Sequence, residues 1–221
     1  MFDLDGTLVE TAPEIADAVN DTLTHHGLPA VSQQQVNDWI GHGTHTLLVS
    51  ALAFAKQQST QEIHQWHELP AISATFSGFY QQRCGTRSTL YPQVREVLAQ
   101  LAAHGVRLAV VTNKEGRYTQ TVLQAHRLEK TFDMVISGDT LPTKKPDPAG
   151  ITHCLKHFGA GVHEALFVGD SSIDAATARN AGVPVWLLPY GYNMGASVHA
   201  AQPDRVIPNF LDFLTLLETS P

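Results

Sequence analysis

Short apolar runs alternate with amphipathic stretches through the second half of the chain. Four apolar runs of strand length are typical of buried β-strands and occupy residues 107–112, 132–137, 165–170 and 183–188. The intervening or flanking stretches have apolar residues at helical spacing and occupy residues 92–104, 116–126, 147–158 and 174–181. Strand and helix repeated in this order predict an α/β fold, a Rossmann-like parallel sheet with helices on both faces.

The segment from residue 13 to residue 85 has a different pattern, with helical periodicity and no convincing strand run. Its first helix is predicted to begin with a capping box between Thr11 and Glu14, with Pro13 at an early helical position, and to end at Gly27. Further helices are predicted over residues 32–40, 44–55 and 60–83. We therefore expect an all-helical cap at 13–85, inserted into an α/β core formed by 1–12 and 86–221.

The predicted first strand is very short. Only residues 1–3 precede an Asp-Gly turn, whereas strands usually have about five or six residues. We expect either that upstream apolar residues are missing or that this strand is stunted. A higher melting temperature in an extended form would support the first alternative.

Polar residues close the predicted strands, at the edge where open α/β sheets bind their ligands. Near the start, Asp3 and Asp5 are two residues apart and would point the same way on an extended backbone. Gly6 permits a sharp turn, and Thr7 offers hydroxyl and amide donors to an anion. An ordinary Asx-turn explains this hexapeptide equally well when it is taken alone.

Three later motifs favour a functional site over a simple turn. Thr112 and Asn113 end one strand with a hydroxyl and an amide, and Lys145 precedes a proline at a predicted helix start. Asp170 and Asp174 lie on either side of another strand-to-helix turn. Each motif alone has an ordinary structural explanation, but their occurrence at successive strand ends of one chain indicates a shared site.

These four motifs match, in order and composition, those of the haloacid dehalogenase-like hydrolases, and the resemblance covers nearly the whole chain. It implies that Asp3 is a nucleophile that forms an aspartyl-phosphate. Asp5 would act as general acid and then base, and its backbone carbonyl would bind the metal. The resemblance also implies roles for four later residues: Thr112 as phosphate ligand, Lys145 as the cation that neutralises nucleophile and phosphate, and Asp170 and Asp174 as metal-binding or supporting acids.

Elementary electrostatics agrees with these roles. A phosphate dianion repels a carboxylate nucleophile, so cations must screen both, and Mg²⁺ held by oxygen ligands is suited to that task. Lys145 adds a further positive charge, and the donors of Thr7, Thr112 and Asn113 fit phosphate oxygens. Relatives that remove halides typically lack the second aspartate, so Asp5 favours phosphoryl chemistry.

The sequence around Trp39 interrupts the helical pattern and is expected to face the site. Gly41, His42 and Gly43 are therefore candidate substrate-binding residues, with His42 either on a substrate carboxylate or simply a surface histidine. The stretch 9–48 resembles bacterial phosphoglycolate phosphatases, which implies 2-phosphoglycolate as substrate. Related sugar-phosphate phosphatases and phosphomutases share the cap and remain alternatives.

Composition narrows the remaining classes. A net charge of −7 with scattered Lys and Arg argues against nucleic acid, and no apolar run approaches the length needed to span a membrane. Two cysteines without metal or redox spacing are typical of reduced thiols in a cytoplasmic protein. The expected partner is a small phosphate ester, and the expected assembly is a monomer or a homodimer. A phospho-accepting receiver domain and a catalytically weak binding protein remain as alternatives of other classes.

Overall fold

A single parallel sheet forms the centre of the larger half of the protein. The structure, a computed structural model, describes residues 1–215. From edge to edge the sheet order is β4, β3, the segment around Phe2, β5, β6 and β7. The strand bounds are β3 (Ala109–Val111), β4 (Met134–Ile136), β5 (Phe167–Gly169), β6 (Val185–Leu187) and β7 (Arg205–Val206). The parallel sheet is confirmed, with β7 as a strand that the sequence pattern did not predict.

The N-terminal segment takes the central place in this sheet. Phe2 pairs in parallel with Val110 on one side and Val168 on the other. Its amide donates to the carbonyl of Ala109 at 2.8 Å, and the Asp3 amide donates to the carbonyl of Val168 at 2.9 Å. Asp3 is therefore held by hydrogen bonds at the carboxyl edge of the sheet even though the segment pairs through so few residues.

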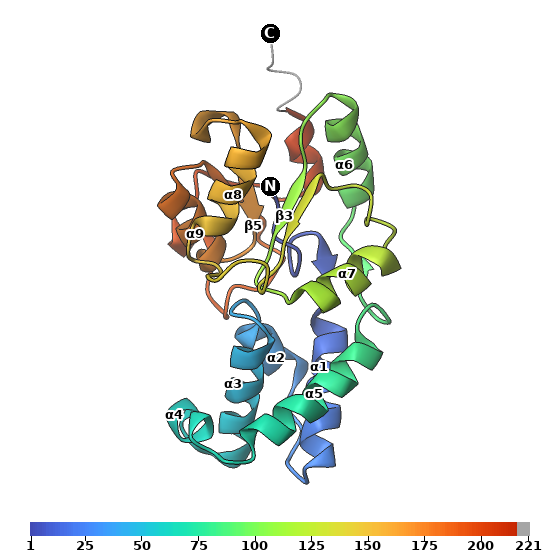
Figure 1. The fold of residues 1–221 in the computed structure, drawn as a ribbon, viewed down its shortest axis with the longest axis vertical. Helices are drawn as coiled ribbons and strands as arrows, with labels where there is room; N and C mark the ends of the chain where they lie inside the picture. Colours follow the sequence, from blue (N-terminus) through green and yellow to red (C-terminus); the bar gives the residue numbers. More distant parts are fainter. Residues whose placement is uncertain (216–221) are drawn as a thin grey trace.

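Helices cover both faces of the sheet, as predicted (Figure 1). Neighbouring strand residues alternate between two apolar clusters, with Val110 packing in the cluster of α6 and Val111 in that of α8. The flanking helices are α6 (Val94–Ala103), α7 (Gly116–Ala125), α8 (Ala149–Phe158) and α9 (Ser172–Ala181). Within the described residues, this half also contains the short 3₁₀ helices η1 (Val162–Glu164), η2 (Val198–Ala201) and η3 (Phe210–Leu214).

A helical block made of α1–α5 lies against the carboxyl edge of the sheet (Figure 1). Its members are α1 (Ala12–His25), α2 (Gln33–Trp39), α3 (Thr44–Lys56), α4 (Thr60–His64) and α5 (Leu69–Arg83). Two short antiparallel strands, β1 (Val9–Glu10) and β2 (Thr89–Leu90), pair where the chain enters and leaves this block. The exact division into a core and a cap at residues 13 and 85 stays a prediction.

The predicted single helix over residues 60–83 is wrong, because the chain forms α4 and α5 with a break between them. Pro70 occupies the first turn of α5. A proline has no amide hydrogen and its ring clashes with the carbonyl four residues earlier, so it is tolerated at a helix start and not in the interior.

The predicted capping box at the start of α1 is also wrong. Thr11 is the N-cap residue, but its hydroxyl donates to Asp5 Oδ1 at 2.7 Å and makes no cap. Glu14 is fully buried and accepts the amide of Ser88 at 3.0 Å. Both side chains thus bind groups of the core side of the molecule, which a local sequence motif does not reveal.

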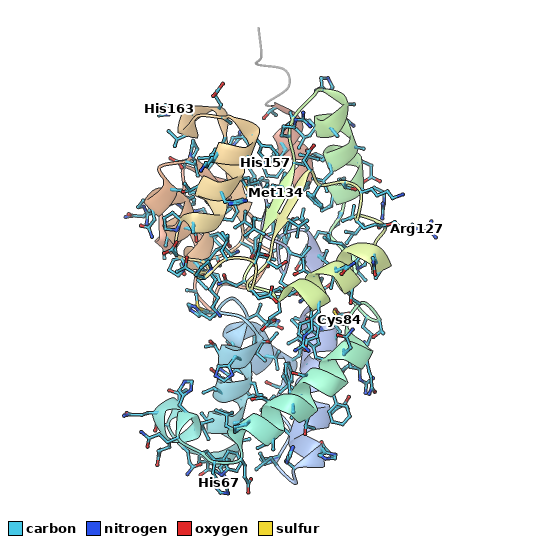
Figure 2. The ribbon with its side chains drawn as sticks, viewed as in Figure 1. His67, Cys84, Arg127, Met134, His157 and His163 are labelled. Atoms are coloured by element: carbon cyan, nitrogen blue, oxygen red, sulfur yellow. The ribbon has the colours of Figure 1, made fainter. Side chains whose placement is uncertain are left out.

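Side chains fill the space between the sheet and the helices throughout (Figure 2). Cys84, labelled there, lies at the junction of α5 with the core, where its thiol contacts the carbonyl of Tyr118 at 3.5 Å. Cys84 and Cys154 are both buried free cysteines. Among residues 1–215, no helix has the length and apolar character required to cross a bilayer.

Candidate active site

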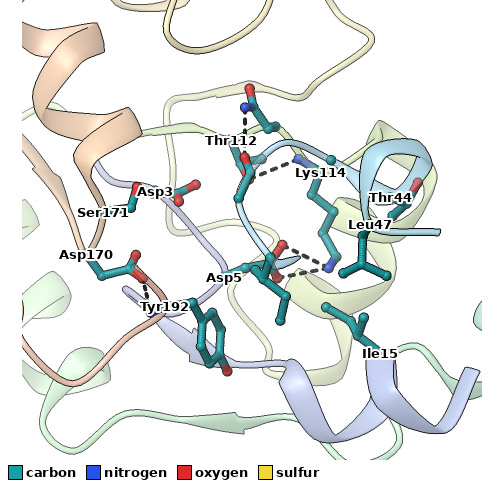
Figure 3. Close-up of a pocket in the computed structure, with 14 residues that line it drawn as sticks. Asp3, Asp5, Ile15, Thr44, Leu47, Thr112, Lys114, Asp170, Ser171 and Tyr192 are labelled. Atoms are coloured by element: carbon teal, nitrogen blue, oxygen red, sulfur yellow. Dashed lines mark hydrogen bonds and ion pairs between the residues drawn. The ribbon is translucent and has the colours of Figure 1, made fainter. Parts of the chain in front are cut away.

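Four of the predicted residues, Asp3, Asp5, Thr112 and Asp170, converge at the carboxyl edge of the sheet (Figure 3). Asp3 follows the central segment, Thr112 follows β3, and Asp170 follows β5. These three residues line one cavity together with Asp5, and Gly41 and Gly43 from the helical block close it. Separate parallel strands therefore deliver the four sequence motifs to one place.

Lys145 holds the carboxylate of Asp3. Its ammonium lies 2.8 Å from Asp3 Oδ1 and 2.7 Å from Asp174 Oδ1, and its side chain is only 3% exposed. Burial raises the pKa of Asp3 to about 6, with the charge of Lys145 acting in the opposite direction. The two carboxylates raise the pKa of Lys145 above its usual value, against the effect of burial, so this lysine is a permanent cation.

Asp174 is a supporting residue for this arrangement. While its Oδ1 atom accepts from Lys145, its Oδ2 atom accepts from the Ser171 hydroxyl at 2.6 Å and from the amides of Ser171 and Asp170. The Ser171 hydroxyl in turn caps α9. Asp174 thereby ties the cation of the site to the rigid start of a helix.

Asp170 is buried and tightly enclosed. Thr7 donates its hydroxyl to Asp170 Oδ1 at 2.6 Å, and the amide of Tyr192 donates to Oδ2 at 2.5 Å. Burial, followed by the charges of Asp174 and Asp3, raises the pKa of Asp170 well above its ordinary value. A group of buried acids that repel one another is an arrangement that a bound cation stabilises.

The acids fit a hard divalent cation. Asp3, Asp170 and Asp174 each offer a carboxylate oxygen, and these atoms lie within 4.8 Å of one another. An all-oxygen donor set suits Mg²⁺ rather than a metal that prefers thiolate or imidazole. The side chain of Asp5 does not belong to this group, which agrees with the expectation that Asp5 contributes its backbone carbonyl.

We expect Gly191→Ala to disturb this acid cluster. A Cβ atom at position 191 would lie 2.2 Å from Asp170 Oδ2 and 2.4 Å from the Gly6 carbonyl, so the backbone or Asp170 must move. The free energy of unfolding should fall by about 1–3 kcal/mol, and hydrolytic activity should fall with it. Gly78→Ala is the matched control, because its Cβ would meet open space. Equal thermal stability and activity in both variants would contradict the prediction.

The chain matches the haloacid dehalogenase-like hydrolase family over residues 1–188. That match spans all four motifs of the site. The protein belongs to this family. It is 38% identical to phosphoglycolate phosphatases from Photorhabdus laumondii and from Pasteurella multocida, in each case over 98% of this chain and over 90% and 96% of the relative.

A solved structure supports the same fold for this hydrolase. A crystal structure described as a predicted phosphoglycolate phosphatase from Haemophilus somnus 129PT superposes with a TM-score of 0.90 at 36% identity. The superposition covers 98% of this chain and 96% of that one. A receiver-type signalling domain is thereby disfavoured, since the family match includes the helical block that such domains lack.

Asp5 of this hydrolase is held directly by Thr11 and Lys114, and indirectly by a tyrosine of the helical block. Thr11 donates to its Oδ1 atom at 2.7 Å, and Lys114 Nζ lies 2.9 and 3.1 Å from its two carboxylate oxygens. The hydroxyl of Tyr80, from α5, in turn accepts from Lys114. Asp5 is thus oriented toward the cavity beside the helical block.

Two residues that line this cavity, Lys114 and Tyr192, were not predicted from the sequence. Lys114 follows the Thr112-Asn113 pair directly, and its place in that run is the signal that could have identified it. Tyr192 lines the cavity, and its hydroxyl accepts the amides of Thr11 and Ala12 at 3.1 Å each. Only a Gly-Tyr-Asn turn after β6 marks Tyr192 in the sequence, and a turn alone carries no functional signal.

Three predicted phosphate donors are engaged within the protein. The Thr112 hydroxyl accepts the amide of Lys114 at 3.2 Å and is free to donate its own hydrogen toward the cavity. Asn113 donates to the carbonyls of Gly41 at 2.9 Å and Lys145 at 3.0 Å. Thr7 is fully buried and donates to Asp170. The phosphate role of all three stays a prediction.

The loop between α2 and α3 reaches the site through its glycines. Gly41 and Gly43 line the cavity, and both have positive φ angles. A Cβ atom on Gly43 would lie 3.2 Å from the Asn113 carbonyl, so the loop approaches the core closely there. The side chain of His42 is exposed and does not line the cavity, while its carbonyl accepts from Lys144 at 2.8 Å. Contact between His42 and substrate stays a prediction.

Proposed function

We propose that this protein is a magnesium-dependent phosphomonoester hydrolase that works through an aspartyl-phosphate on Asp3, with 2-phosphoglycolate as its preferred substrate. The observation that carries this is the carboxylate of Asp3, which is ion-paired with Lys145 at 2.8 Å and faces a cavity shared with Asp5 and Asp170. We also propose that residues 13–85 act as a cap over this cavity.

The chemistry divides into two transfers. A carboxylate oxygen of Asp3 attacks phosphorus while the ester P–O bond breaks, and Asp5 gives its proton to the departing oxygen. Asp5 then takes a proton from a water molecule whose oxygen attacks the same phosphorus. The Asp3–phosphorus bond breaks, inorganic phosphate leaves, and both aspartates return to their starting states.

Positive charge near Asp3 makes the first attack feasible. Lys145 compensates the charge of the nucleophile and of the incoming phosphate, and it does so without reorganisation because Asp174 holds it in place. A magnesium ion held by Asp3, Asp170 and the Asp5 carbonyl, with Asp174 in support, would supply further neutralisation of phosphate charge. The Thr112 hydroxyl is available to a phosphate oxygen.

Two observations support a small substrate. The curated relatives at 38% identity carry the name phosphoglycolate phosphatase. The cavity measures about 40 Å³, room for about three water molecules, and is bounded on the side of the helical block by Ile15, Ile40 and Leu47. The helical block forms one side of this cavity, so a compact ester fits with a smaller displacement of these helices than a sugar phosphate requires.

A panel of phosphate monoesters tests this proposal. With Mg²⁺ present, we expect kcat/KM to be highest for 2-phosphoglycolate and lower for hexose phosphates, because a larger leaving group holds the cap open. Removal of divalent cations with EDTA should abolish turnover, and added Mg²⁺ should restore it. A flat substrate profile would overturn the substrate assignment, and full activity in EDTA would overturn the metal requirement.

A further inference from the structure

We propose that Lys114 forms a binding subsite for the carboxylate of the substrate, and so determines the preference for short phosphorylated carboxylic acids. This inference rests on the proposed phosphatase function. It assigns a role to a buried cation that the two-step chemistry does not use.

Lys114 is an unusual lysine in its position and burial. Its side chain is 1% exposed, yet it lines the cavity. Among the described residues that line this cavity, Lys114 is the one with a positively charged side chain. Lys145 contacts Asp3 but does not line the cavity. A buried ammonium is costly unless anions accompany it, and Asp5 supplies one such anion. The exposure of Lys114 to the cavity places the same ammonium where an anionic group of the substrate can also reach it.

The location of Lys114 relative to Asp5 fits the geometry of a phosphorylated hydroxy acid. Asp5 must reach the oxygen that leaves phosphorus, and Lys114 Nζ lies 2.9 Å from Asp5 Oδ1. In 2-phosphoglycolate a single methylene separates that oxygen from the carboxylate. A substrate whose leaving oxygen contacts Asp5 therefore places its carboxylate within reach of the Lys114 ammonium.

The surroundings of Lys114 strengthen an ion pair formed there. Ile15 from α1 and Leu47 from α3 line the same cavity beside Asp5 and Lys114 (Figure 3). Apolar walls exclude water, so a charge-assisted hydrogen bond is stronger there than at an exposed surface.

Lys114 can bind a second carboxylate by giving up one of its two contacts to Asp5. Its ammonium has three donors, and these contact both carboxylate oxygens of Asp5 and the Tyr80 hydroxyl, so one donor turns to the substrate. Asp5 then keeps its other contact to Lys114 and an independent hydrogen bond from Thr11 at 2.7 Å. Tyr80, on α5, accepts a hydrogen bond from the Lys114 ammonium. Closure of the helical block therefore places Tyr80 and Lys114 in contact at the subsite. The competing explanation is that Lys114 only positions Asp5, in which case every phosphate ester depends on it equally.

The test compares 2-phosphoglycolate with 2-hydroxyethyl phosphate, which replaces the carboxylate with a neutral group of similar size. In Lys114→Met, kcat/KM should fall for both esters, but the ratio of the two values should fall by a further tenfold or more. Lys114→Arg should retain more of the ratio, because it keeps the charge. Lys156→Met is the control: it removes an exposed lysine of α8 that does not line the cavity, and the ratio should stay at the wild-type value.

Inhibition by glycolate provides a second readout that does not depend on turnover of 2-phosphoglycolate. With 2-hydroxyethyl phosphate as substrate, glycolate should inhibit the wild type and Lys156→Met, and should inhibit Lys114→Met at least about tenfold more weakly. An unchanged substrate ratio together with unchanged glycolate inhibition in Lys114→Met overturns the subsite. A wild type that shows no preference for 2-phosphoglycolate overturns the proposed substrate instead, and the glycolate measurement then still decides the role of Lys114.

Discussion

Asp3→Asn is expected to reduce turnover of any phosphate monoester by about 10³-fold or more, since the amide cannot act as the nucleophile. The substitution changes neither the size of the side chain nor its place at the sheet edge. Turnover of 2-phosphoglycolate and of a chromogenic ester, each with saturating Mg²⁺, measures the effect. Retention of activity by a preparation free of other phosphatases would show that Asp3 is not the nucleophile.

Stability is the control that separates chemistry from folding in this variant. Burial raises the pKa of Asp3 to about 6, so at neutral pH and without a metal the folded state carries an unfavourably buried charge. Removing that charge should leave the melting temperature in EDTA unchanged or raised. A large drop in melting temperature would mean that the loss of activity reflects misfolding.

Lys145→Met is expected to lower both activity and stability. The Lys145 ammonium lies 2.8 Å from Asp3 Oδ1 and 2.7 Å from Asp174 Oδ1. When the ammonium is removed, both carboxylates remain buried. Breaking a buried ion pair from one side typically costs about 3–5 kcal/mol, because the remaining charge has no partner. Activity should fall as well, since nothing then offsets the repulsion between Asp3 and the phosphate.

The stability loss in Lys145→Met should depend on pH, with a sign that follows from Asp3. Its folded-state pKa, already raised to about 6, rises further when the opposing charge of Lys145 is lost. A carboxyl group with a raised folded-state pKa destabilises the fold above its unfolded pKa of about 3.9, and increasingly so up to the folded value. The deficit relative to wild type should therefore be largest near pH 8 and shrink as the pH falls toward 4.

Thermal unfolding in EDTA across this pH range measures the deficit. Lys156→Met, which removes an exposed lysine from α8, is the control and should track the wild type at every pH. A deficit that is constant with pH would show that lost packing, rather than the unpaired carboxylates, causes the destabilisation. Added Mg²⁺ should recover part of the stability at pH 8, because it supplies positive charge to the same acids.

The sheet and its flanking helices could be predicted because they depend on local periodicity. Strands buried on both faces are continuously apolar, and the helices that cover them are amphipathic, so the local pattern of each element indicates how it is buried. The start of α5 is an exception to prediction by periodicity. The apolar pattern continues across Pro70, but a proline is tolerated only at a helix start, so residues 60–83 form two helices.

The acidic motifs could be assembled from the sequence for a related reason. Parallel strands all present their carboxyl ends at one edge, so Asp3, Thr112 and Asp170 had to meet once the strands were recognised. The capping box at Thr11 failed because its two side chains had better partners elsewhere. Thr11 contacts Asp5, and Glu14 contacts the amide of Ser88, 74 positions away.

The fold class, the family and the residues at the strand ends were predictable from the sequence, because periodicity and strand-end chemistry are local properties of the chain. Only the tertiary structure revealed that Lys114 pairs with Asp5, that Tyr80 contacts Lys114 across the two halves, and that Tyr192 binds Asp170. These contacts join residues 109, 34 and 22 positions apart. Such pairings depend on how the helical block lies against the sheet, and the burial and charge that they impose on each side chain exist only in the folded chain.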